Sequence, residues 1–136
     1  MQLSPYLNFD GQCEEAFKFY ERCLRAKLAS SFRYEGTPAA GQVPAGWGNK
    51  IMHACLVMGD QELMGADCPP DRYQKPQGFS VTIALQDAAE AERIFHELAE
   101  NGTVQMPIQE TFWATRFGML VDQFGIPWMI NCGKSA

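Results

Sequence analysis

The feature of this sequence that most constrains its fold is an internal repeat. Residues 4–9 form an apolar segment that is followed by an acidic turn, an amphipathic segment and apolar segments ending near residues 59–64. The same order recurs over residues 79–130, where Ala91 corresponds to Ala16. A repeated unit that cannot bury its own apolar face needs a partner unit. The repeat therefore predicts an α+β chain of two tandem βαβββ modules, which form a curved mixed sheet around a cleft.

Length and loop composition set the expected domain organisation. A chain of 136 residues fits a single domain. We expect module one over about residues 1–66, a proline-rich linker over about 67–78, and module two over about 79–132. The cleft between the modules is where we look for function.

Two amphipathic segments predict the helices. In residues 13–24 the apolar side chains recur every three or four positions, as on one face of a helix. The second helix is expected to begin after Asp87, an N-cap residue followed three positions later by Glu90 in a capping-box spacing, and to end at Asn101-Gly102. Strands are expected at residues 30–35, 51–58, 62–64, 103–106 and 116–122.

Charge and hydropathy exclude some functions. A net charge of −5 without a basic run argues against nucleic-acid binding. No apolar stretch approaches the roughly 20 residues that span a bilayer, and the N-terminus lacks a signal-peptide pattern. We expect a soluble cytoplasmic protein without a membrane partner. Five cysteines without a Cys-x-x-Cys pair predict neither a zinc knuckle nor a redox dithiol. We expect them to be buried, with Cys68 the most exposed.

Four stretches carry a resemblance to a known family. Residues 6–20, 52–60, 109–118 and 122–131 resemble the PhnB-like group of the glyoxalase/bleomycin-resistance (vicinal oxygen chelate) superfamily. Members of that group are often labelled demethylubiquinone-methyltransferase-like. The resemblance implies the paired βαβββ fold and a homodimer. The sequence contains no glycine-rich loop of a Rossmann-type methyltransferase, so it carries no S-adenosylmethionine fingerprint.

The resemblance also implies where a metal would be held. Active members of the superfamily bind a divalent metal through four residues, and the family's spacing assigns these positions to Pro5, Leu63, Ser80 and Met129. Hard divalent cations prefer His, Asp and Glu ligands. We therefore expect no superfamily-type metal site and no cofactor, with a divalent metal disfavoured.

The residues expected to line a substrate pocket are polar and aromatic side chains and one methionine near the predicted cleft. They are Tyr6, His53, Glu110, Trp113, Arg116, Met129 and Asn131. Strand alternation puts Met129 and Trp128 on opposite faces, and the metal position implied by the resemblance places Met129 and Asn131 toward the cleft and Trp128 under a helix. For His53 two interpretations stay open: a histidine bonded to backbone at the sheet surface, or a polar group or general base in the cleft.

The segment Gln109–Arg116 also has two interpretations. Aromatic side chains with a few convergent polar groups are typical of a small-molecule site. Alternatively Phe112 and Trp113 cap the sheet edge while Glu110 pairs with Arg116 on the surface.

These observations favour a small-molecule binding protein or lyase-like enzyme of the glyoxalase/PhnB-like class without the usual four-ligand metal site. The alternative is a metal-dependent isomerase, lyase or dioxygenase with displaced ligands that include His53 and Glu110. A purely structural dimer is a third possibility. The sequence leaves open whether the protein is an enzyme and which ligand it binds.

Overall fold

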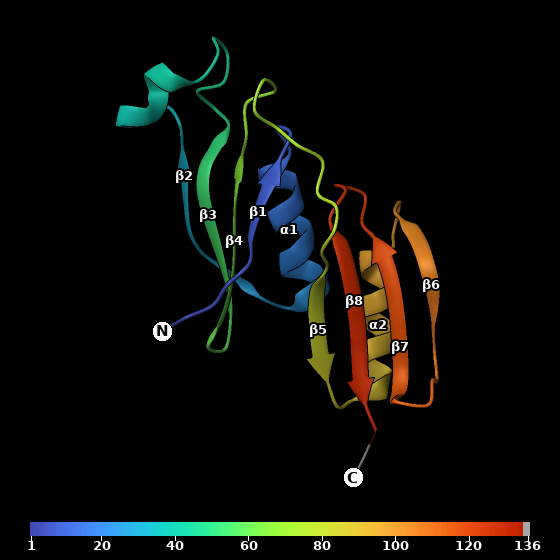
Figure 1. The fold of residues 1–136 in the computed structure, drawn as a ribbon. Coiled ribbons are helices and arrows are strands. Elements are labelled where there is room, and N and C mark those ends of the chain that lie inside the picture. Colours follow the sequence, from blue (N-terminus) through green and yellow to red (C-terminus); the bar gives the residue numbers. More distant parts are fainter. Residues whose placement is uncertain (135–136) are drawn as a thin grey trace. The chain divides into compact units, whose positions relative to one another are not determined.

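The computed structural model describes residues 1–134 and contains two compact units, Met1–Gln74 and Lys75–Ala136. Each unit is one βαβββ module, as the repeat predicts (Figure 1). Among residues 1–134 no helix is long and apolar enough to cross a membrane.

The first unit forms a four-stranded mixed sheet. Its order is β1-β4-β3-β2, with β1 parallel to β4 and the other neighbours antiparallel. The elements are β1 (Tyr6–Phe9), α1 (Cys13–Leu24), β2 (Lys27–Arg33), a short 3-10 helix η1 (Pro38–Gln42), β3 (Ile51–Met58) and β4 (Gln61–Asp67).

The second unit repeats this topology. Its order is β5-β8-β7-β6, again with one parallel pair, β5 with β8. The elements are β5 (Val81–Leu85), α2 (Ala88–Leu98), β6 (Thr103–Gln109), β7 (Ala114–Val121) and β8 (Pro127–Gly133). The equivalence of residues 4–9 and 79–85 as first strands is confirmed.

One face of each sheet is covered by the helix of its own unit. The predicted apolar stripe of α1 is buried, and Phe19 is buried with it. In each unit a glycine allows the helix to approach the sheet closely, on β4 in the first unit and on β7 in the second: a Cβ on Gly65 would lie 2.9 Å from the ring of Phe17, and one on Gly118 would lie 2.6 Å from the ring of Phe95. We call the opposite face of each sheet its far face.

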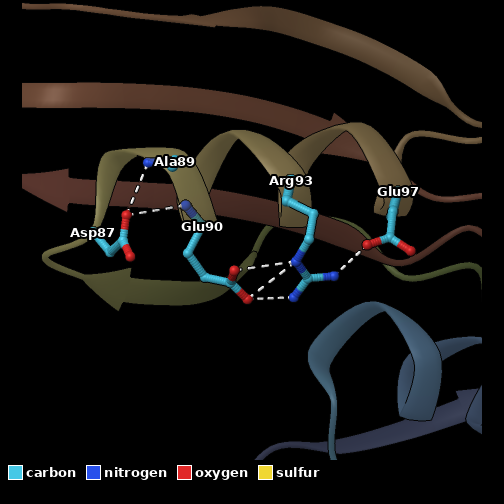
Figure 2. Close-up of polar contacts among 5 residues, drawn as sticks. All are labelled: Asp87, Ala89, Glu90, Arg93 and Glu97. Atoms are coloured by element: carbon cyan, nitrogen blue, oxygen red, sulfur yellow. Dashed lines mark hydrogen bonds and ion pairs between the residues drawn. The ribbon is translucent and has the colours of Figure 1, made fainter.

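The start of α2 agrees with the predicted N-cap but not with the capping box. The Asp87 carboxylate accepts hydrogen bonds from the backbone N–H groups of Ala89 and Glu90 (Figure 2). The Glu90 side chain does not complete the box, because its carboxylate pairs with Arg93, which also bonds Glu97 one turn further on. The Glu90 carboxylate therefore binds the Arg93 guanidinium.

The edge strands differ from their predicted limits. β2 begins at Lys27 and not at Ser30, and β6 continues to Gln109 beyond the expected Met106. Both strands have one neighbour and are largely exposed, so burial imposes little apolar alternation on their sequences. Pro107 interrupts the pattern of β6 and lies at a register shift, as is usual for proline in an edge strand.

Candidate functional site

A polar pair lies on the far face of the first sheet. The Tyr6 hydroxyl and Nδ1 of His53 are 3.0 Å apart, and the two ring centroids are 5.7 Å apart. Tyr6 belongs to β1 and His53 to β3, so the tyrosine side chain reaches across β4. Burial raises the pKa of the Tyr6 phenol, and the neighbouring Cys13 and Tyr34 raise it further. Phe32, half exposed, lies opposite His53 on β2.

The far face of the second sheet is apolar with one unpaired acceptor. Asn131 and Met129 of β8 pair in register with Phe117 and Met119 of β7. The ring of Phe117 packs edge-on against Trp113, with centroids 5.3 Å apart. Among residues 1–134, Asn131 Oδ1 is a buried side-chain atom without a hydrogen-bond partner. Buried polar atoms are normally paired, so an unpaired one requires an explanation.

Arg116 does not join this group. It pairs in register with Cys132, which lies on the helix-covered face, and its Nε donates to Glu92 Oε1 of α2 at 2.9 Å. Adjacent strand residues point to opposite faces, so Arg116 and Phe117 are on different sides of the sheet. The structure therefore places Arg116 on the helix side of the sheet, apart from Met129 and Asn131 on the far face.

Glu110 pairs with Lys134 and not with Arg116, the partner considered from the sequence. Its carboxylate lies 3.4 Å from Nζ of Lys134, and both side chains are exposed. The surface pairing of Glu110 with Arg116 does not occur. Glu110 belongs to the second unit and His53 to the first, so neither unit by itself contains both of the displaced metal ligands considered above.

The positions assigned to a superfamily metal need correction. Leu63 is 8% exposed on the helix-covered face, because it pairs with Leu56 beside the Gly65–Phe17 contact. Met129 lies on the far face. Counting four residues from the turn glycine does not give equivalent positions in the two units, because the two turns differ in length. Two residues separate the paired Met58 and Gln61 in the β3–β4 turn, whereas the β7–β8 turn between the paired Val121 and Pro127 is longer.

Parallel pairing gives the correct equivalence. Tyr6 pairs with Met64 in the first unit, and Thr82 pairs with Met129 in the second. As the equivalent far-face positions, Tyr6, Met64 and Thr82 replace Pro5, Leu63 and Ser80, and Met129 is kept. A phenol, a hydroxyl and two thioethers do not fit a hard divalent cation. Residues 1–134 also contain no group of three or more His, Cys, Asp or Glu side chains that could hold a metal ion.

A hollow in the second unit was not predicted. It has a volume of about 600 Å³ and lies where residues 75–80 meet the β7–β8 turn and one end of the far face, including Met129. Phe117 was likewise missed, although its two-residue spacing from Met119 on one strand face was available in the sequence. No local pattern marks the hollow, because chain segments distant in sequence form it.

Two βαβββ units of this topology define a protein of the glyoxalase/bleomycin-resistance fold. The glyoxylase/bleomycin resistance protein/dioxygenase domain from Frankia sp. EAN1pec shares this fold with a TM-score of 0.66 at 13% identity, over 98% of this chain and 95% of that one. Residues 1–131 match the profile of the 3-demethylubiquinone-9 3-methyltransferase family, and the chain belongs to that family.

Two relatives are similar over almost their whole length. Protein YjdN from Escherichia coli (strain K12) is 37% identical over 142 residues, which cover 98% of this chain and 97% of YjdN. The crystal structure of protein PA1353 from Pseudomonas aeruginosa has a TM-score of 0.90 at 44% identity, with 99% of each chain covered. The resemblance inferred from the four sequence stretches is confirmed.

Proposed function

We propose that this protein binds a small organic molecule on the far face of its second sheet and needs no resident metal. The observation that carries the proposal is the unpaired Asn131 Oδ1, a buried acceptor among Phe117, Met129 and other apolar side chains. Leaving such a group unpaired costs about 1–3 kcal/mol. A ligand that donates an N–H or O–H group to Asn131 would recover this cost.

The first sheet offers a polar group of its own on its far face, the Tyr6–His53 pair. Apolar walls with a few placed polar groups are typical of small-molecule sites. The methyltransferase label of the family gives no substrate here, since the sequence has no S-adenosylmethionine fingerprint. We further propose that the protein acts as a homodimer, which light scattering at micromolar concentration would test.

The first experiment is a thermal-shift screen of small carbonyl, aromatic and amide compounds. A ligand at 100 times its dissociation constant stabilises a protein by about 2.7 kcal/mol. Compounds that shift the wild type should lose their effect in Asn131→Leu and keep it in Asn49→Leu, an exposed asparagine in the first unit.

The stability of Asn131→Leu in the absence of ligand provides a second measurement. Replacing an unpaired buried acceptor by an apolar group of similar shape is neutral or stabilising. Asn131→Leu should therefore be as stable as the wild type, or more stable by up to about 1 kcal/mol. A clear destabilisation together with unchanged compound shifts would contradict the proposal.

The rival function is a metal-dependent isomerase, lyase or dioxygenase that uses His53 and Glu110. Under this rival, divalent metals alone would raise the melting temperature, and Glu110→Ala would abolish that rise. A shift from organic compounds that is unaffected by Glu110→Ala favours the binding function.

A further inference from the structure

The hollow of the second unit has a distinctive charge. Its lining contains one cation, Lys75, and no aspartate or glutamate, although the whole protein carries a net charge of −5. Amide and hydroxyl side chains accompany the lysine, and Phe79, Val121, Pro127 and Met129 supply an apolar wall. The volume of about 600 Å³ lies within the ordinary range of small-ligand pockets.

Lys75 is available to a ligand, whereas the other cations of this unit have partners. Arg93 and Arg116 bond glutamates of α2, and Lys134 lies near Glu110. Lys75 has no ion pair within residues 1–134 and is exposed at the hollow. A lysine acts as a compact positive charge for one anionic group.

We propose that this hollow binds a small organic carboxylate, with the carboxylate at Lys75 and its aromatic or aliphatic body against Phe79 and Met129. The inference rests on the proposed function, because Met129 is shared by the hollow and the face that carries Asn131. It names the ligand class, an organic monoanion, and assigns the anion-binding role to Lys75.

The charge arrangement favours a carboxylate over a neutral compound of the same shape. A hydrogen bond to a charged group is stronger than a neutral one, and no acidic side chain in the lining repels the ligand. The attraction is partly exposed to solvent, so it should weaken as salt is added.

The test is an NMR titration of the whole protein with phenylacetate and with its neutral amide, phenylacetamide. Backbone signals of Gly78, Ser80 and Gly125, which line the hollow, should move with phenylacetate. Its affinity should exceed that of the amide by up to about fivefold, the factor that corresponds to roughly 1 kcal/mol for one partly screened charged contact. Lys75→Gln should remove this preference, whereas Lys134→Gln, at a lysine outside the hollow lining, should retain it.

Two results would overturn the inference: no movement of the hollow signals at millimolar phenylacetate, or equal affinities for acid and amide in the wild type. Compounds that move the Asn131 side-chain signals but not those of the hollow would overturn it while supporting the proposed function. Hollow binding that survives Asn131→Leu would support the inference and remove Asn131 from the proposed function.

Discussion

The hydroxyl of Tyr6 on β1 lies 3.0 Å from Nδ1 of His53 on β3. The raised pKa of the phenol, caused first by burial, keeps it protonated at neutral pH. A neutral imidazole has one protonated and one acceptor nitrogen. We predict that the phenol donates to Nδ1, an arrangement that places the proton of the neutral His53 ring on Nε2.

This tautomer is directly measurable. Long-range ¹H–¹⁵N NMR spectra should show neutral His53 with Nε2 protonated in the wild type and a mixture of tautomers in Tyr6→Phe. Tyr34→Phe is the matched control, since the Tyr34 hydroxyl donates to the backbone oxygen of Asp67. Protonation of Nδ1 in the neutral wild-type ring would contradict the assignment.

Asp67 should be a main contributor to the stability of the first unit. Its carboxylate is 2% exposed and accepts hydrogen bonds from the backbone N–H groups of Cys13, at the start of α1, and Ile51, at the start of β3. Asp67→Ala leaves both donors without this acceptor and should cost about 2–4 kcal/mol in the free energy of unfolding. Urea unfolding, compared with the exposed Asp71→Ala, measures the loss; equal stabilities would refute it.

The same carboxylate should make stability depend on pH. Desolvation raises the Asp67 pKa, outweighing the hydrogen bonds from Ile51 and Cys13 and the nearby Lys50, which lower it. The folded state then binds this proton more tightly than the unfolded state. The resulting stabilisation is complete below the unfolded pKa of about 4 and decreases as pH rises through the higher folded pKa.

Asp67→Asn cannot titrate and therefore lacks this dependence. Urea unfolding at intervals from pH 4 to 7 should show the free energy of unfolding of the wild type falling relative to that of Asp67→Asn. Parallel profiles for the two proteins would exclude the raised pKa.

Trp128 should contribute far more to stability than Trp113. Trp128 is 1% exposed, and its Nε1 donates to Asp122 Oδ2 at 2.8 Å. Trp128→Phe removes this charge-assisted bond and some buried volume, so we expect a loss of about 2–4 kcal/mol. Trp113, 47% exposed, is the matched position, and Trp113→Phe should cost less than about 1 kcal/mol. Chemical denaturation of both variants measures which substitution lowers the free energy of unfolding more.

Arg116→Gln should leave ligand affinity unchanged, because Arg116 and its partner Glu92 lie on the helix side of the second sheet. Both side chains are more than a third exposed, so the stability cost should stay below about 1 kcal/mol. The thermal-shift series used for Asn131→Leu provides the measurement. Loss of compound shifts in Arg116→Gln would restore this arginine to the site.

The sequence by itself determined the modules, the helices and the family. The stripes of α1 and α2 and the Asp87 cap are local patterns, set by helix periodicity and by backbone N–H groups that need an acceptor. Edge strands β2 and β6 were less predictable, since one neighbour and high exposure impose little pattern on their residues.

Tertiary structure alone decided which side chains share a face. A turn that is longer in one unit shifts the strand register, and each shift of one residue moves a side chain to the opposite face. Leu63 and Met129, alike in their spacing from a turn glycine, thereby lie on different sides. Arg116 was separated from Asn131 by the same alternation, and the hollow at Lys75 arose where distant segments meet. Such relationships depend on pairing between strands, which is not written in the local sequence of either strand.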